Sequence, residues 1–136
     1  MEQAKLDKIL DNHKLWLQTN GEQGERANLR YANLSYANLS SADLRSADLS
    51  SADLRYADLR YADLDFSAFP LWCGGLDVHI DDRQATQLLY HLVRNVQYSK
   101  NTSKAMKKIC KIKSLVNQAN KFHRVKECGE VGADND

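Results

Sequence analysis

The chain has 136 residues and a mass of 15.5 kDa, enough for one ordinary domain or two small ones. Its 19 Lys and Arg residues oppose 18 Asp and Glu residues, so the formal net charge of +1 argues against both a globally basic nucleic-acid binder and a globally acidic protein. No apolar run is long enough to cross a bilayer, the first residues lack the apolar core of a secretory signal, and three cysteines are an odd number for a disulfide framework. We therefore expect a globular, cytoplasmic protein with reduced thiols and no membrane contact.

Residues 3–18 have the apolar spacing of a helix. The apolar face contains Leu6, Ile9, Leu10, His13 and Leu17, which stand at i, i+3, i+4, i+7 and i+11. Asn20 and Gly21 end this pattern, and a glycine-rich stretch leads into the next segment. Residues 1–26 are therefore predicted to be a capping helix and a linker.

Residues 27–71 consist of nine consecutive pentads. From Ala27 they read ANLRY, ANLSY, ANLSS, ADLRS, ADLSS, ADLRY, ADLRY, ADLDF and SAFPL. Eight of them open with Ala and carry Leu at the centre, whereas the ninth is degenerate. The leucines recur without a slip at positions 29, 34, 39, 44, 49, 54, 59 and 64.

A period of five fits neither a helix nor a flat strand. A residue repeated every fifth position advances by about 500° around a helix and makes no stripe, and it alternates between the faces of a strand. Within one pentad, Ala and Leu are two apart and point the same way if the backbone is extended. A chain that turns a corner after each pentad therefore puts Ala and Leu inside. A polar group there would cost roughly 1–3 kcal/mol if it had no partner.

The pentads ANLRY through ADLDF resemble the pentapeptide-repeat family, whose motif is A(D/N)LXX, over about a third of the chain. The resemblance implies a mainly β solenoid with α caps: a right-handed quadrilateral β-helix with four pentads to a coil, and here a little over two coils. Residues twenty apart should then stack, as Tyr36 over Tyr56 and Asn33 over Asp53. The short length and the tail that follows also resemble small phage or mobile-element proteins of this family.

Residues 72–136 follow a different pattern. Residues 72–75 predict a turn, and residues 77–80 predict a short extended piece. Asp81 and Gln84 predict the start of a helix with an apolar stripe of Ala85, Leu88, Leu89, Leu92, Val93 and Val96. Asn101 or Thr102 would begin a second helix with Ala105, Ile109, Ile112, Val116 and Ala119 on one face. We expect a helical pair, packed within itself, on the repeat or on a second subunit, and a frayed acidic tail from Gly129.

Charge is unevenly distributed along the chain. Residues 1–26 carry five acidic and four basic residues, residues 27–71 six and four, and residues 72–136 seven and eleven, which gives net charges of −1, −2 and +4. Four lysines with helical spacing form a candidate partner-binding basic helix: Lys104, Lys107, Lys108 and Lys111. They predict contact with phosphates or with a protein partner, and the alternative is a solvated helix face.

Neither catalysis nor a metal site is predicted. Zinc-ligand residue types occur at Cys73, His79, His123 and Cys128, but their spacings of C-x5-H and H-x4-C match no finger or ribbon. The sequence contains no GxSxG, P-loop, GxGxxG or HExxH motif. The aspartates of the repeat would project from different sides of a rod that has no cleft. We expect a protein that is not an enzyme and has no cofactor.

Tyr and Arg at the ends of the pentads have the composition of a protein interface. The candidate partner-binding residues on the repeat are Arg30, Tyr31, Tyr36, Asp53, Arg55, Tyr56, Asp58, Arg60, Tyr61 and Asp63. The alternative is that the aromatic side chains only stiffen the corners of the rod.

The first functional hypothesis is a non-enzymatic inhibitor or shield of a nucleic-acid-handling complex, because a rigid rod of duplex width with spaced carboxylates can occupy a duplex-binding groove. The resemblance implies phage counter-defence, such as an anti-CRISPR protein that mimics duplex DNA, or topoisomerase protection. The alternatives are a scaffold module that forms a homodimer through its C-terminal helices, and direct nucleic-acid binding through the basic helix.

Overall fold

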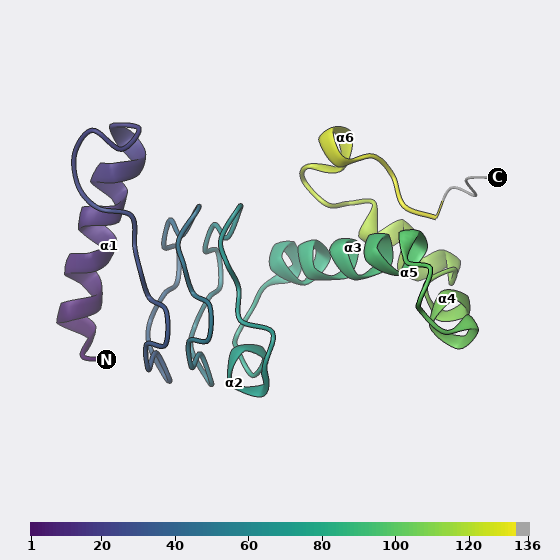
Figure 1. The fold of residues 1–136 in the computed structure, drawn as a ribbon, viewed down its shortest axis with the longest axis horizontal. Coiled ribbons are helices and arrows are strands. Elements are labelled where there is room, and N and C mark those ends of the chain that lie inside the picture. The colour runs from purple at the N-terminus through teal and green to yellow at the C-terminus, as the bar shows by residue number, and fades with distance from the viewer. Residues whose placement is uncertain (133–136) are drawn as a thin grey trace. The chain divides into compact units, whose positions relative to one another are not determined.

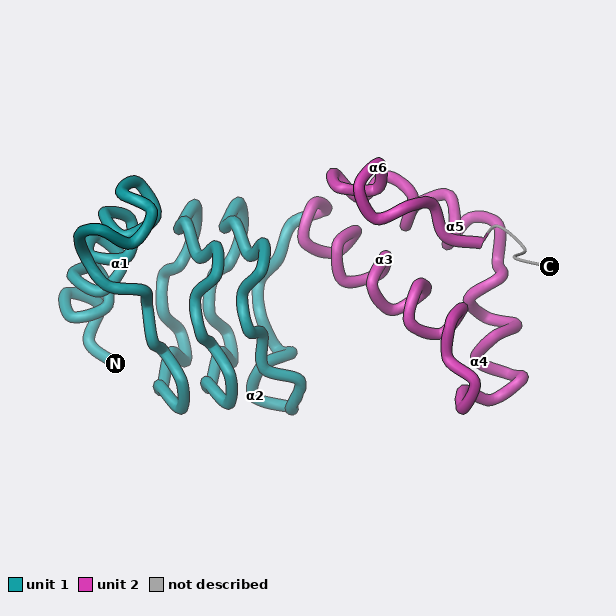
Figure 2. Tube along the Cα trace, turned by 45° about the horizontal axis from the view of Figure 1, so that its top comes forward, with its two compact units in different colours: residues 1–81 teal, residues 82–136 magenta. Residues whose placement is uncertain are grey.

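A computed structural model describes residues 1–132 as two compact units, 1–81 and the residues from Asp82 onward (Figure 1, Figure 2). The first unit contains α1 (Gln3–Gln18), the repeat and α2 (Cys73–Leu76). The second contains α3 (Asp82–Tyr98), α4 (Lys104–Ile109), α5 (Lys113–Ala119) and α6 (Val125–Cys128). Part of the expected frayed tail, residues 133–136, lies outside the described range.

The prediction of a mainly β solenoid, a right-handed quadrilateral β-helix, is wrong. Over residues 1–132 the structure has six helices and no β-strand. The repeat contains only isolated parallel bridges: Asn28–Asp48, Asn33–Asp53, Asn38–Asp58, Asp43–Asp63, Asp48–Ala68 and Asp58–His79. Because two of the five residues in each pentad form a turn, only three residues are extended, and only the central one bridges.

The register of twenty residues is nevertheless confirmed by five of these bridges, whereas Asp58–His79 joins residues twenty-one apart. We use the term coil for one such round of four pentads. Neighbouring coils exchange backbone hydrogen bonds, as where Leu34 N–H donates to Asp53 O at 2.8 Å and Asp53 N–H donates to Ala32 O at 2.9 Å. The leucines from Leu29 to Leu59 are at most 1% exposed, so the predicted inward column of leucine is confirmed.

A tight turn closes each pentad. The N–H of the next Ala donates to the Leu carbonyl, at 3.0 Å from Ala32 to Leu29. The fifth residue of each of the first eight pentads has a positive φ, between 58° and 64°. The second residue, Asn or Asp, accepts the N–H of the fourth through its side chain, as Asn33 does from Ser35 at 3.1 Å. This Asx turn explains why only Asn or Asp occupies the second position in those eight pentads.

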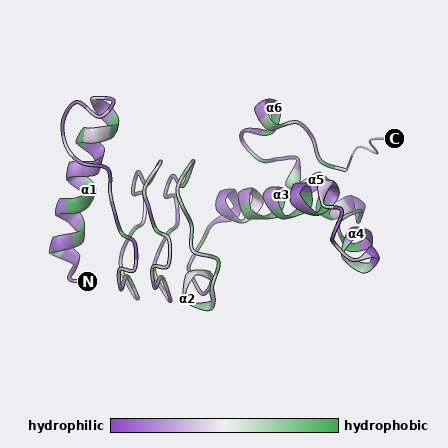
Figure 3. Ribbon diagram, viewed as in Figure 1, coloured by the Kyte–Doolittle hydropathy of each residue, from purple (hydrophilic) through white to green (hydrophobic). Residues whose placement is uncertain are grey.

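Helix α1 covers the first coil, over the range expected from the sequence. Figure 3 shows apolar bands on an otherwise hydrophilic α1. Leu6 and His13 are fully buried in the first unit. The Gln3 amide also makes the backbone hydrogen bonds that a preceding coil would make. Its Nε2 donates to Asn38 O at 3.0 Å, and its Oε1 accepts from Asn38 N–H at 3.1 Å. The cap thus buries the apolar end of the coils and satisfies their unpaired backbone.

Residues 77–81 continue the last coil although they lack the repeat motif. His79 bridges Asp58, with hydrogen bonds of 2.9 Å in both directions between the two segments, from Leu59 N–H to His79 O and from His79 N–H to Ala57 O. Val78 and Ile80 flank His79 and pack on the core, so they take the places of Ala and Leu in a pentad. Helix α2 occupies the segment where the sequence predicted a turn.

The second unit differs from the predicted helical pair, because four helices form over its described residues. The single helix expected from Asn101 or Thr102 onward is divided into α4 and α5; Ser103 caps α4 by accepting from Met106 N–H at 3.1 Å, and Ile112 is extended. The buried face of α3 is set by Tyr90, which stacks on Phe122 with ring centroids 4.6 Å apart. Three residues of the predicted stripe are therefore exposed: Ala85, Leu88 and Leu92.

Leu44→Ala is expected to lower the free energy of unfolding of the first unit by about 2–5 kcal/mol, because Leu44 is 0% exposed and truncation leaves a cavity. Leu71→Ala is the matched control: Leu71 is 86% exposed, and the change should stay within about 0.5 kcal/mol. Urea unfolding followed by tryptophan fluorescence reports this unit, since Trp16 and Trp72 both lie in it. Equal losses for the two variants would contradict the inward leucine column.

Candidate interaction surface

The twenty-residue register separates the predicted contact residues of the repeat. Residues in the same turn of successive coils form what we call a turn column. Tyr36 and Tyr56 share one column, and Tyr61 shares the next with Ser41. Tyr31 lies a quarter of a coil before Tyr36, in a third column. The four predicted tyrosines therefore lie in three different turn columns.

One column forms an exposed aromatic stack. The rings of Tyr36 and Tyr56 are stacked with centroids 5.0 Å apart, which confirms the predicted pairing. Tyr36 is 75% and Tyr56 is 47% exposed. Arg55 precedes Tyr56 in the same turn. This stack brings two large aromatic side chains and one guanidinium together on the surface of the first unit.

The aspartates beside this column are ion-paired within their own pentads. Arg55 contacts Asp53 and Arg60 contacts Asp58, each with Nη2–Oδ2 at 2.6 Å and Nε–Oδ1 at 2.9 Å. Asp43 and Arg45 are paired in the same way. Sequence reasoning placed these carboxylates on different sides of a rod and missed the pairing. The signal that would have revealed it is Asp and Arg two residues apart within one pentad.

The pairing also controls protonation. The hydrogen bond from the Arg60 side chain, followed by the one from the Arg60 backbone N–H, lowers the pKa of Asp58 to about 2. The Arg55 side chain lowers the pKa of Asp53 in the same way. At neutral pH both carboxylates are therefore charged, and each has a guanidinium against it.

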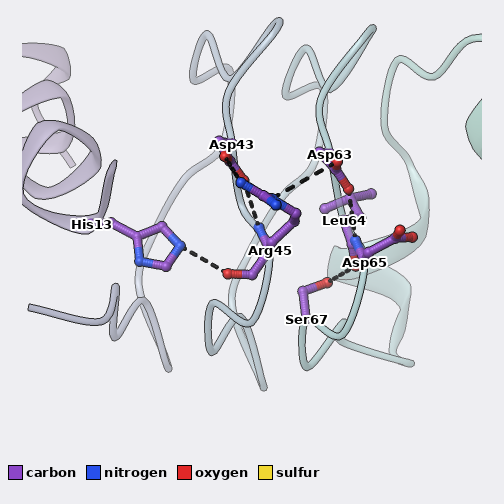
Figure 4. A network of polar contacts seen from close by, with 7 residues as sticks. All are labelled: His13, Asp43, Arg45, Asp63, Leu64, Asp65 and Ser67. Atoms are coloured by element: carbon purple, nitrogen blue, oxygen red, sulfur yellow. Dashed lines mark hydrogen bonds and ion pairs between the residues drawn. The ribbon is translucent and has the colours of Figure 1, made fainter. Parts of the chain in front are cut away.

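Asp63 lies beside another carboxylate, since it bridges Asp43 in the neighbouring coil. Figure 4 shows Arg45 between the two carboxylates. Its Nε is 2.8 Å from Asp43 Oδ1 and 4.0 Å from Asp63 Oδ2. One guanidinium thus offsets the repulsion expected from stacking two like charges.

Arg30 differs from the other arginines of the repeat because Asn28, not Asp, stands two residues before it. Its guanidinium lies over the Tyr31 ring, 4.9 Å from the centroid, and its Nη2 donates to Tyr31 Oη at 3.0 Å. Arg30 and Tyr31 form a cation–aromatic contact in another turn column, separate from the Tyr36–Tyr56 stack.

The predicted basic helix is short. Lys104, Lys107 and Lys108 lie on α4, whereas Lys111 follows the end of that helix. Lys107 is half-buried and the other three are exposed. Because α4 ends at Ile109, the four lysines do not all lie on a single helix, contrary to the prediction.

Sequence reasoning missed three exposed apolar side chains in the first unit. Phe66 is 72%, Leu71 is 86% and Trp72 is 46% exposed. Ser51, Leu71 and Trp72 line a shallow open hollow, and Trp72 Nε1 donates to Ala52 O at 2.9 Å. The degenerate ninth pentad was the available signal, since a broken motif at the end of a repeat often marks a change of role.

The zinc-ligand residue types are divided between the two units. Cys73 and His79 lie in the first, whereas His123 and Cys128 lie in the second. Residues 1–132 contain no group of three or more His, Cys, Asp or Glu residues placed to hold a metal ion. The three cysteines form no disulfide: Cys73 is exposed, Cys110 buried and Cys128 half-buried. No helix within this range has the length and apolar character to span a membrane.

Asp58→Asn is expected to make the stability of the first unit less sensitive to low pH. Because the folded pKa of Asp58 is depressed, its ion pair stabilises the fold above the ordinary pKa of 3.8, and that contribution is lost as pH falls towards 2. Asparagine keeps the Asx turn but carries no charge. In thermal unfolding, the melting temperature of the wild type should fall more steeply between pH 3.8 and 2 than that of the variant. Asp58→Ala, which also removes the acceptor, should be less stable than Asp58→Asn at pH 7, and equal acid profiles for wild type and Asp58→Asn would refute the pairing.

Comparison with known proteins agrees with this geometry. Residues 25–65 match the family model for pentapeptide repeats, in eight copies. No curated protein and no solved structure matches the chain. With its Ala and Leu side chains turned inward and an Asn or Asp at the start of every turn, the segment from 25 to 65 is a run of pentapeptide repeats.

Proposed function

We propose that this chain is a non-enzymatic protein-binding module whose first unit contacts its partner through the turn column of Tyr36 and Tyr56. The observation that supports the proposal is the exposed stack of these two rings beside Arg55. Tyr and Arg are the residues that most often dominate the binding energy of protein interfaces. The stack is also held by the backbone register, so little side-chain entropy remains to be lost on binding.

The charge distribution favours a protein interface over mimicry of duplex DNA. A mimic needs rows of carboxylates that no cation offsets, but Asp43, Asp53 and Asp58 each contact an arginine of their own pentad. The whole repeat has a net charge of only −2. Inhibition of a nucleic-acid enzyme by this chain would therefore depend on shape and aromatic contact.

The first partner class to test remains a nucleic-acid-handling complex, such as a CRISPR effector or a topoisomerase. The family resemblance motivates this choice, and phage counter-defence is the corresponding biological role. The chain should be captured with its partner from a bacterial host, and the partner should then be assayed for nuclease or supercoiling activity. If micromolar concentrations of the protein have no effect on nuclease or supercoiling activity, this class of partner is excluded.

The double variant Tyr36→Ala/Tyr56→Ala is expected to weaken binding to the captured partner at least tenfold, because it removes the aromatic stack. Tyr31→Ala/Tyr61→Ala is the matched control, since these tyrosines are also exposed (69% and 71%) and have a similar positive φ but lie in other turn columns. Affinities measured by calorimetry should separate the two pairs. Equal losses in both would contradict a site centred on Tyr36 and Tyr56.

Arg55→Gln/Arg60→Gln distinguishes the two modes of binding by the sign of its effect. Loss of both guanidiniums makes the repeat more acidic by two charges, so a duplex mimic should bind a DNA-binding partner more tightly. A Tyr and Arg interface should bind more weakly. We expect weaker binding, measured by the same calorimetric titration, with circular dichroism confirming that the variant is folded.

Self-association is a second candidate function, favoured by the exposed leucines Leu88 (42%) and Leu92 (52%) on α3. A homodimer through this helix would cover an apolar face that the second unit leaves open. Light scattering over a range of concentrations tests it, and a monomer at every concentration would exclude it. Gel shifts at low salt test the remaining alternative, nucleic-acid binding through Lys104, Lys108 and Lys111.

A further inference from the structure

His13 on α1 is fully buried where the helix meets the first coil, and both of its ring nitrogens are engaged. The Ala27 N–H donates to Nδ1 at 3.1 Å. Nε2 lies 3.0 Å from the Arg45 carbonyl oxygen. Figure 4 shows the ring pointing towards that oxygen. The ring also stacks on Trp16 with centroids 5.7 Å apart. One imidazole therefore connects α1 to two separate segments of the repeat.

These two contacts select one protonation state. A carbonyl oxygen can only accept, so Nε2 carries the proton that is donated to Arg45 O. An N–H can only donate, so Nδ1 presents its lone pair to Ala27. The neutral Nε2–H tautomer satisfies both contacts. In the imidazolium, a second N–H at Nδ1 would face the Ala27 N–H, and that hydrogen bond would be lost.

The surroundings of the ring also disfavour the charged form. Burial lowers the pKa of His13 below its ordinary value of 6.5, and it outweighs the opposing hydrogen bond to Arg45 and the attraction of Asp43. The charges of Arg26 and Arg45 act in the same direction as burial. Asp43 has only a limited effect on the ring, because its carboxylate is held by the Arg45 guanidinium.

We propose that His13 is a proton-controlled latch: the neutral imidazole fastens α1 to the repeat, and the imidazolium releases that end of the helix and uncovers the first coil. The release follows because protonation replaces a hydrogen bond with two opposed donors and places a charge in a buried site. Leu6 and Gln3 hold the other end of α1. Opening therefore begins at the end of α1 nearest the linker.

The direction of the pH effect follows from the geometry. The folded chain binds the proton of His13 more weakly than the unfolded chain, so the contribution of His13 to stability is complete above pH 6.5. This contribution decreases as pH falls through the lower, folded pKa. A single group of this kind changes the equilibrium constant of unfolding by up to about tenfold per pH unit.

The test is urea unfolding of the full chain, followed by tryptophan fluorescence from pH 7.5 to pH 4.5. His13→Gln can present one acceptor and one donor but does not titrate. Wild type should become less stable on acidification by up to about tenfold per pH unit relative to this variant. His79→Gln is the matched control, because His79 is exposed in the last coil, and it should keep the wild-type profile. Identical profiles for wild type and His13→Gln would overturn the proposal.

A measurement on wild type alone keeps the proposal testable if His13→Gln does not fold. The amide of Ala27 donates to His13, whereas the amide of Asp53 donates to Ala32 O at 2.9 Å inside the repeat. After correction for intrinsic exchange rates, hydrogen exchange at Ala27 should accelerate between pH 7 and pH 5 while protection at Asp53 stays constant. Unchanged protection at Ala27 over this range would refute the latch.

Discussion

The hydrogen bond from the fourth N–H of a pentad to the Asn or Asp side chain at its second position is the interaction on which the first unit depends. It recurs from Asn28 to Asp63 and starts a turn after every three extended residues. Turns at this interval return the chain to the same place after twenty residues, so each Leu packs against leucines of neighbouring coils. The same interval keeps the extended stretches too short to become strands.

A stack of such coils has two ends, and different segments of the chain cover them. At the first coil, α1 supplies apolar side chains together with the polar groups of Gln3 and His13, which bond to exposed backbone. At the last coil, residues 77–81 extend the register with Val78 and Ile80 in the inward places. The capping helix therefore depends on specific polar contacts as well as on hydrophobic burial, and the histidine among them makes one contact dependent on protonation.

Several of the charges on the outer surface of the repeat are paired with an opposite charge. Three Asp–Arg pairs each lie within one pentad, so these charges are offset locally and the aromatic groups of the turn columns are a prominent exposed feature. A positive φ at the fifth position is unusual for tyrosine, and the hydrogen-bonded packing of neighbouring coils stabilises it. A rigid, nearly neutral surface with stacked rings suits contact with another protein better than electrostatic attraction of a nucleic-acid enzyme.

The sequence alone determined the inward leucines and the range of α1, because each follows from a local periodicity that only one kind of burial satisfies. The register of twenty residues was implied by the resemblance to pentapeptide repeats. Only the tertiary structure showed that the bridges remain isolated, that Val78 and Ile80 replace a pentad, and that arginines pair with the aspartates. It also placed Tyr90, and not Leu88 or Leu92, in the core of the second unit. These features depend on which neighbours a side chain meets across coils or helices, and hydrophobic periodicity along the chain does not contain that information.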